Sequence, residues 1–255
     1  MSSPAAAVLR IEGLGKNRVD EQGSQVAVLR DVELSLFAGR ITVVIGPSGG
    51  GKSTLIRLLN RLEEASKGRV LLDGQDIRRY DPLQLRRQVA LLAQKPFVFS
   101  GTVLENLQRP FQFQGRIPPP GNDPQLRELM ELCQLPVSWL QRDAGSLSVG
   151  QQQRLCLVRS LATGPEVLLL DEPTSALDRP TVDGLAVSLR AVCRKRQLAV
   201  LLVTHDLHLA EIIADDLAYL EDGRILEQGN AAEVLGRPRT PALQRFLTPP
   251  TRERN

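Results

Sequence analysis

Apolar and polar residues alternate along the first third of the chain in a way that predicts β-strands. Residues 32–36, Val-Glu-Leu-Ser-Leu, alternate with a period of two, which is typical of a strand with one buried face. Residues 41–45 are almost uniformly apolar and β-branched, as expected of a strand covered on both faces. A further strand is predicted at residues 8–11.

From residue 41 onward, predicted strands alternate with predicted helices. The helices are expected at residues 53–61, 82–87, 182–195 and 207–214, and the later strands at 89–93, 167–170, 198–203, 217–220 and 224–227. Turns are predicted at residues 73–74 and 222–223, where Asp precedes Gly. This alternation predicts parallel strands, with ligands bound at their carboxyl ends.

Strand patterns are missing between residues 95 and 163. Helical patterns at 102–107, 124–133 and 149–161 surround a proline-rich loop at 117–121. We therefore predict one α/β domain with a core of residues 1–94 and 164–247, a helical insertion at about 95–163, and a flexible tail at 248–255. The core should hold a mainly parallel sheet and an N-terminal antiparallel β subdomain.

Composition narrows the class of protein only moderately. With 255 residues, of which 42% are hydrophobic, the chain can bury a large core, and a net charge of +3 is too small to predict a nucleic-acid partner. Three widely separated cysteines, Cys133, Cys156 and Cys193, are expected to be core thiols in a reducing compartment. The apolar runs are too short for a membrane span, and residues 5–9 do not fit a signal peptide. We expect a cytoplasmic protein that could attach peripherally to a membrane protein.

A glycine-rich segment between the strand at 41–45 and the following helix carries the strongest chemical motif. It fits the phosphate-binding pattern G-x-x-x-x-G-K-[ST], in which backbone amides and the helix N-terminus surround phosphate oxygens. Lys52 would reach the terminal phosphates and Ser53 would ligate Mg²⁺. The expected ATP-binding residues are Gly46, Pro47, Ser48, Gly49, Gly50, Gly51, Lys52, Ser53 and Thr54. The motif predicts a P-loop NTPase.

A second motif ends the apolar strand at residues 167–170 with two acids. A buried strand would deliver Asp171 to the sheet edge beside the phosphate loop, where a carboxylate can hold Mg²⁺. Glu172, one residue later, points elsewhere and can act as a general base toward water. These two acids are the candidate metal ligand and the candidate catalytic base.

The segment Leu-Ser-Val-Gly-Gln at residues 147–151 precedes an amphipathic helix. Together with the two motifs above, it resembles the signature of the nucleotide-binding subunits of ATP-binding-cassette (ABC) transporters, Leu-Ser-Gly-Gly-Gln. The resemblance covers almost the whole chain. It implies that Ser148, Val149, Gly150 and Gln151 contact ATP held by the P-loop of a second copy, in a head-to-tail dimer.

Other positions match the family in order. By resemblance, Gln94 corresponds to a glutamine that touches Mg²⁺ and senses the membrane partner, and Ser175 and Asp178 belong to a loop that crosses the dimer interface. His205 would contact the γ-phosphate and position the catalytic water, so the implied catalytic residues are Lys52, Glu172 and His205.

Two positions depart from the family pattern. Val149 replaces the first signature glycine, and we expect it to be tolerated because Gly150 supplies the backbone freedom. A many-fold rise in ATPase activity of Val149→Gly would instead show an impaired wild-type site. The family's adenine-stacking aromatic is missing between residues 8 and 32. The guanidinium of Arg18 could stack there, or Arg18 could be a surface arginine.

The resemblance implies an ATP-hydrolysing motor, with ATP and Mg²⁺ as cofactors, that drives a separate membrane permease from the inner face of the cell membrane. A substrate-binding protein is a possible further partner, and no nucleic acid is expected. The main alternative is a soluble ABC ATPase of the cofactor-assembly type, and a P-loop small-molecule kinase is a rival of another class. Residues 99–107 resemble subunits linked to phosphate import and to metal-ion export, which gives two hypotheses for the cargo.

Overall fold

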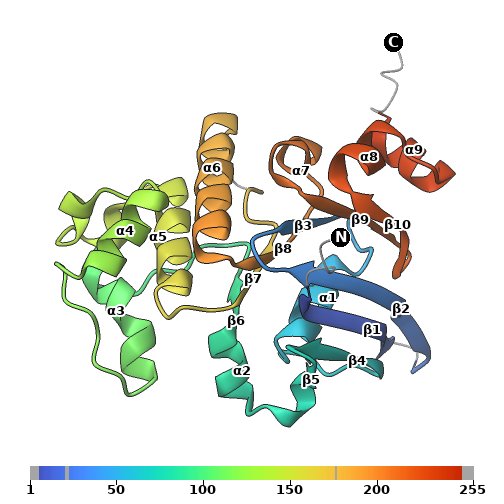
Figure 1. Ribbon diagram of the computed structural model, residues 1–255, viewed down its shortest axis with the longest axis horizontal. Coiled ribbons are helices and arrows are strands. Elements are labelled where there is room, and N and C mark those ends of the chain that lie inside the picture. The colour runs from blue at the N-terminus through green and yellow to red at the C-terminus, as the bar shows by residue number, and fades with distance from the viewer. Residues whose placement is uncertain (1–5, 21–22, 176, 249–255) are drawn as a thin grey trace.

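The computed structural model describes residues 6–20, 23–175 and 177–248. Most of the predicted flexible tail, residues 249–255, lies outside the described residues, as does position 176 between Ser175 and Asp178. Figure 1 shows a group of helices (α3, α4 and α5) at one end of the molecule and two β-sheets at the other.

The larger sheet has six strands in the order β10-β9-β3-β8-β7-β6. Its strands are β3 (Ile41–Ile45), β6 (Val89–Leu92), β7 (Val167–Asp171), β8 (Ala199–Thr204), β9 (Asp216–Glu221) and β10 (Arg224–Asn230). The neighbours from β9 to β6 pair in parallel, and β10 pairs antiparallel to β9. The prediction of a mainly parallel core sheet is confirmed.

The smaller sheet is antiparallel, with the order β2-β1-β4-β5. It consists of β1 (Ala7–Val19), β2 (Gln25–Phe37), β4 (Lys67–Leu72) and β5 (Gln75–Asp76). The strands β1 and β2 are much longer than the predicted residues 8–11 and 32–36. Outside those ranges their residues do not alternate cleanly, and the shifts in register between β1 and β2 explain why a period-two pattern misses them.

The predicted helices are present, with small differences at their ends. They are α1 (Lys52–Leu59), α2 (Pro82–Gln88), α3 (Val103–Phe113), α4 (Pro124–Leu132), α5 (Val149–Leu161), α6 (Arg179–Arg196) and α7 (Leu207–Ile213). Short 3₁₀ helices occur at Ile77–Arg79, Val137–Trp139 and Ala144–Ser146. Two further helices, α8 (Ala231–Gly236) and α9 (Pro241–Leu247), were not predicted.

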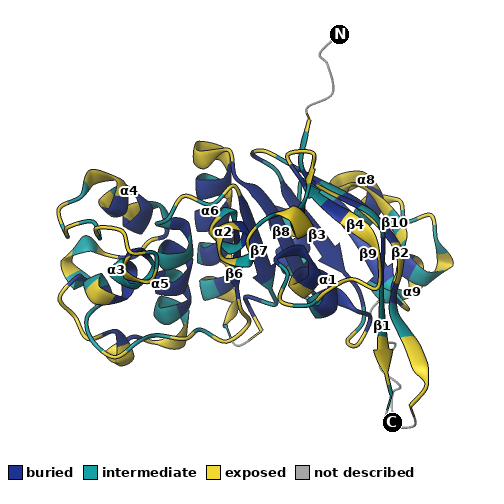
Figure 2. Cartoon of the chain, turned by 90° about the horizontal axis from the view of Figure 1, so that it is seen from below, coloured by how far each residue is buried: buried dark blue, intermediate teal, exposed yellow. Residues whose placement is uncertain are grey.

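The inner strands of the six-stranded sheet, such as β3, β7 and β8, are buried on both faces (Figure 2), whereas the edge strand β10 is largely exposed. In β7, Leu168 and Leu170 join the apolar cluster formed with the helices, whereas Val167 and Leu169 join the cluster formed with the antiparallel sheet and α1. The three cysteines are buried free thiols, as predicted. This double packing fixes the carboxyl ends of β3, β7 and β8 relative to one another.

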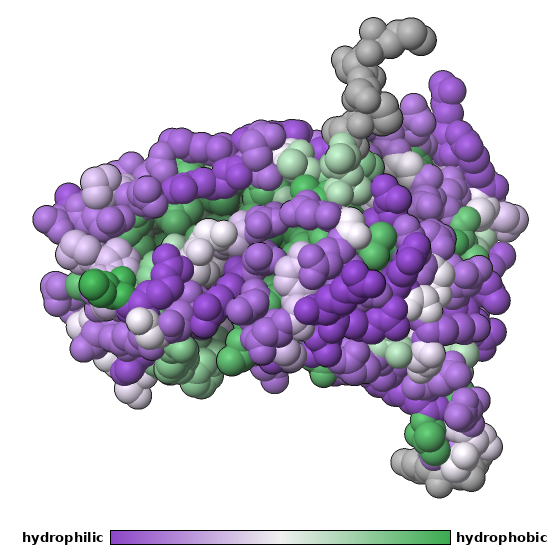
Figure 3. All heavy atoms as spheres, turned by 60° about the horizontal axis from the view of Figure 1, so that its bottom comes forward, coloured by the Kyte–Doolittle hydropathy of each residue, from purple (hydrophilic) through white to green (hydrophobic). Residues whose placement is uncertain are grey.

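Among the described residues, none of the helices combines the length and the apolar character needed to cross a membrane. The face shown in Figure 3 is largely hydrophilic, and its apolar side chains form several small patches.

Candidate nucleotide-binding and hydrolysis site

The glycine-rich segment forms the turn between β3 and α1, as its sequence predicted. Gly46 has a φ of 157°, and a Cβ atom built on it would lie 2.0 Å from the carbonyl oxygen of Leu220. Gly51 stands immediately before α1 with a φ of 101°. Both positions therefore require glycine, and they let the chain turn closely so that α1 begins at Lys52.

The Lys52 side chain is buried at the centre of this turn. Its Nζ donates hydrogen bonds to the carbonyl oxygens of Gly46 (2.9 Å) and Pro47 (3.0 Å) and lies 3.7 Å from Oε1 of Glu172. Burial lowers the pKa of Lys52, and the carboxylates of Glu172 and Asp171 oppose that shift. The lysine is therefore held within its own loop, beside the acids that end β7.

Asp171 ends β7 and contacts the first turn of α1. The Ser53 hydroxyl donates a hydrogen bond of 2.9 Å to Oδ1 of Asp171. Burial raises the pKa of Asp171, and this hydrogen bond opposes the shift. A hydroxyl and a carboxylate at one point fit Mg²⁺, which takes oxygen ligands, few of them from the protein, when it binds with phosphates.

Glu172 connects Lys52 to His205. It has a φ of 48°, and its backbone N–H donates to the carbonyl of Val203 (2.9 Å) on the neighbouring strand β8. Its Oε2 lies 2.8 Å from Nδ1 of His205 and 3.4 Å from the Thr204 hydroxyl. A positive φ in a non-glycine residue is uncommon and concentrates at functional sites. Here it accompanies a carboxylate held between a lysine and a histidine.

The structure also brings Gln94 and Ser175 together. The Gln94 side-chain amide, two residues after β6, donates a hydrogen bond of 3.1 Å to the Ser175 hydroxyl. Asp178 has a different local role, because its carboxylate accepts from the Thr181 N–H (3.3 Å) as the N-cap of α6. Ser175 therefore contacts the segment after β6, and Asp178 caps α6.

The segment at residues 148–151 begins α5. Ser148 and Gln151 form a reciprocal capping box, and Val149 is 49% exposed. A Cβ atom on Gly150 would lie 2.6 Å from Cγ2 of Thr181, so the glycine lets α5 approach α6 closely. Within the described part of the chain, this segment forms no hydrogen bond or ion pair with residues 46–54. Ser148 and Val149, at the N-terminus of α5, are exposed to solvent.

Arg18 lies beside the start of α1. It contacts Glu63, a residue that the sequence analysis did not single out. Its Nη2 donates to Oε1 of Glu63 (2.8 Å) and to the Thr54 hydroxyl (3.2 Å), while its side chain stays 47% exposed. Glu63 also lies 3.8 Å from Lys16 and 3.6 Å from Arg57. No short-range pattern reveals Glu63, because its partners come from β1 and α1. The stacking role of Arg18 stays a prediction.

Comparison with known proteins assigns this geometry to a family. A family model described as "ABC transporter" matches residues 29–175, more than half of the chain. The chain belongs to the ABC transporter family. It is 40% identical over 246 residues to protein STAR1 of Oryza sativa subsp. japonica (96% of this chain and 69% of the relative). It is 38% identical over 231 residues to the methionine import ATP-binding protein MetN 3 of Pectobacterium atrosepticum (89% and 67%).

Solved structures of ABC proteins share the fold. The structure of cbiO1 from Clostridium perfringens, part of the ABC transporter complex cbiONQ, superposes with a TM-score of 0.79 at 25% identity and covers 91% of both chains. The cassette MJ0796, solved as a dimer in a post-hydrolysis state with ADP and Pi, gives a TM-score of 0.73 at 27% identity and covers 88% of this chain and 98% of its own.

These comparisons confirm the predicted family and fold class. The chain is an ATP-binding ABC ATPase of the transporter type, and this assignment is favoured over a soluble cofactor-assembly ATPase. The ABC cassette fold also explains why the P-loop, Asp171, Glu172 and His205 meet at the carboxyl edge of one parallel sheet.

Proposed function

We propose that this protein is the motor subunit of a membrane transporter, which binds ATP between two copies of the chain and couples hydrolysis to a separate permease. The observation that carries the proposal is the connected group Lys52, Glu172 and His205, beside the Ser53–Asp171 pair. A nucleotide-binding module without hydrolysis would not need a carboxylate held against both a lysine and a histidine.

The roles of the side chains follow from their contacts. Lys52 would exchange its hydrogen bonds to the Gly46 and Pro47 carbonyls for bonds to phosphate oxygens, and Ser53 and Asp171 would hold Mg²⁺. Mg²⁺ supplies charge neutralisation to the phosphates. Glu172 takes the proton of the attacking water, and His205 positions the Glu172 carboxylate and the terminal phosphate. Gln94 and Ser175, which hydrogen-bond to each other, would add polar side chains beside the Mg²⁺ site.

A second copy of the chain completes the site. The N-terminus of α5 presents Ser148 and the Gly150 amide, which suit an anion, but they do not contact the P-loop of their own chain. A head-to-tail dimer would place them on ATP bound to the partner, and Ser175 and Asp178 would lie at that interface. The dimeric structure of MJ0796 supports this arrangement.

A cluster of exposed aromatic side chains supports docking of a membrane permease. Phe97 (64% exposed) and Phe113 (70% exposed) both pack edge-on against Phe99, with ring centroids 5.1 and 5.8 Å apart. The guanidinium of Arg159 lies 5.1 Å from the Phe99 ring centroid. Exposed aromatic clusters are typical of interaction sites. Because this cluster follows Gln94 closely in the chain, a partner bound here can influence the nucleotide site.

We place the protein on the inner face of the cell membrane, held there by its permease. The relatives include methionine import proteins, and a substrate-binding protein is a further partner if this transporter is an importer. Residues 99–107 leave phosphate and a metal ion as the cargo hypotheses. Copurification from membranes would identify the permease and thereby the cargo class.

The decisive test is the Glu172→Gln variant. Removing the general base while keeping the shape should lower the ATPase rate by at least about 100-fold, and ATP should then hold the variant as a dimer in size-exclusion chromatography. Glu211→Gln, an exposed residue on α7, is the matched control and should hydrolyse ATP normally. Hydrolysis at the wild-type rate without a trapped dimer would refute the proposed function.

A further inference from the structure

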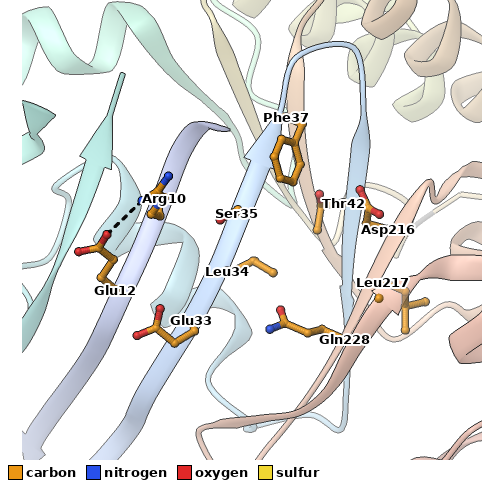
Figure 4. Close-up of a pocket in the computed structure, with 11 residues that line it drawn as sticks. Arg10, Glu12, Glu33, Leu34, Ser35, Phe37, Thr42, Asp216, Leu217 and Gln228 are labelled. Carbon is orange, nitrogen blue, oxygen red and sulfur yellow. Dashed lines mark ion pairs between the residues drawn. The ribbon is translucent and has the colours of Figure 1, made fainter. Parts of the chain in front are cut away.

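A cavity of about 610 Å³ lies where the antiparallel sheet and the six-stranded sheet diverge. Figure 4 shows β2 running between Arg10 and Glu12 on one side and Thr42, Asp216 and Gln228 on the other. Thr42 is near the start of β3, whereas the P-loop follows the end of that strand, about 13 Å away at the usual rise per residue. The cavity is therefore separate from the nucleotide site.

One carboxylate of the lining is left without a cation. Asp216 accepts two hydrogen bonds of 2.7 Å from Arg40, and Glu12 accepts one of 2.6 Å from Arg69. Glu33 accepts from the Gly13 N–H (2.6 Å) but forms no ion pair among the described residues. Its charge is thus available to a positive group that enters the cavity.

One guanidinium of the lining is only loosely held. Nη1 of Arg10 lies 3.6 Å from Glu12, and that carboxylate is bound more tightly by Arg69. Arg10 pairs in register with Ser35, so Glu33, two residues before Ser35 on the same face, is its diagonal neighbour. Diagonal neighbours have Cα atoms about 7–8 Å apart, and their Cβ atoms are somewhat closer. This spacing leaves room for a small group between the two charges.

The rest of the cavity lining combines apolar and polar side chains. Phe37, half-buried on the same face of β2 as Glu33, provides the apolar surface, whereas Leu217 behind it is only 1% exposed. The Thr42 hydroxyl, in a residue only 1% exposed, has no hydrogen-bond partner within the described part of the chain. A buried polar atom without a partner is unusual in a folded protein and marks a place where a ligand atom or water is needed.

We propose that this cavity binds a small zwitterion of the amino-acid type. Its carboxylate lies on Arg10, its ammonium on Glu33, and its apolar side chain against Phe37. A purely cationic ligand would leave Arg10 unused, and a purely anionic one would meet Glu33, so a molecule that carries both charges gains a contact with each residue of the pair.

Isothermal titration with the intact protein tests this binding, with L-leucine as the probe. Leucinamide lacks the carboxylate and N-acetylleucine lacks the ammonium, and each should bind at least tenfold more weakly than leucine. Glycine, which cannot contact Phe37, should also bind more weakly. No heat of binding from leucine up to about 10 mM, a concentration at which even a Kd near 1 mM is detectable, would overturn the proposal.

Substitutions in the cavity lining test whether leucine binds at this site. Glu33→Gln and Arg10→Met should each weaken leucine binding at least tenfold, whereas Glu211→Gln and Arg30→Met, which carry the same changes outside the cavity, should not. Equal affinity in all four variants, or displacement of leucine by a non-hydrolysable ATP analogue, would place the ligand elsewhere and refute the inference. The inference does not rest on the proposed function, because it requires neither hydrolysis nor a permease.

Discussion

At the scale of single residues, Asp171 shows a conflict between function and stability. Its carboxylate is partly buried beside Ser53, and burial raises its pKa above the ordinary value of 3.8. The charged form is therefore less favourable in the folded than in the unfolded chain. The resulting loss of folding stability is fully present above the raised pKa of the folded state. It disappears as the pH falls below the pKa that Asp171 has in the unfolded chain.

The conflict predicts that Asp171→Asn stabilises the ligand-free protein near pH 7. Its melting temperature should rise by about 1–3 °C, and the gain should vanish as the pH approaches about 4, while ATP hydrolysis is lost with the metal ligand. Calorimetric melts across this pH range provide the measurement, and Asp31→Asn, which changes an exposed aspartate on β2, is the control. A lower melting temperature for Asp171→Asn at pH 7 would contradict this account.

At the scale of elements, two helices begin with the same capping box but serve different purposes. Thr102 and Glu105 cap α3, and Ser148 and Gln151 cap α5. In both boxes the hydroxyl satisfies a backbone N–H of the first turn, while the N3 side chain binds the N-cap N–H. Of these two helices, only α5 is proposed to contact ATP through its N-terminus.

We expect Thr102→Ala and Ser148→Ala each to lower the free energy of unfolding by about 1 kcal/mol. ATPase activity should fall at least about tenfold in Ser148→Ala, because a hydrogen bond to a charged phosphate is lost, and should stay near wild type in Thr102→Ala. Urea denaturation and steady-state hydrolysis measure the two effects. Equal activity losses in both variants would show that Ser148 acts only as a cap.

Element prediction succeeded where a local pattern sufficed. The strand at 41–45 was predicted with its observed bounds, and the buried character of β7 followed from its apolar run. The extended lengths of β1 and β2 depend on pairing between distant segments, and α8 and α9 were missed. Candidate site residues on strand ends were predictable, whereas the Glu63 contacts were not, because they form only after β1 reaches α1.

At the scale of the whole molecule, the proposed site is shared between two chains, and this can be tested by mixing inactive variants. Lys52→Ala inactivates the P-loop half of the composite site, and Ser148→Ala inactivates the half that the partner chain contributes. A mixed dimer would join the intact P-loop of one variant to the intact Ser148 of the other, so an equal mixture should recover about a quarter of the wild-type ATPase activity.

One result of the mixing experiment would contradict a site shared between two chains. If each chain hydrolysed ATP alone, the mixture would show only the average of the two inactive proteins. A mixture of Lys52→Ala with Glu172→Gln is the matched control, because both changes damage the same half of the site and no mixed dimer regains an intact one.

The sequence by itself indicated the family of this protein and its candidate site residues. The glycines of the P-loop, Lys52, the acids after residue 170 and the segment at 147–151 are local patterns whose spacing is set by backbone geometry and hydrogen bonding, so they can be read without the fold. Tertiary structure alone decided which of these residues meet. Glu172 binds Lys52 and His205 because β3, β8 and β7 are successive strands of the sheet. The register of β1 and β2 sets the neighbours of Glu33, which forms no ion pair with any residue that the structure describes. Such contacts depend on packing between distant segments, which no local pattern encodes.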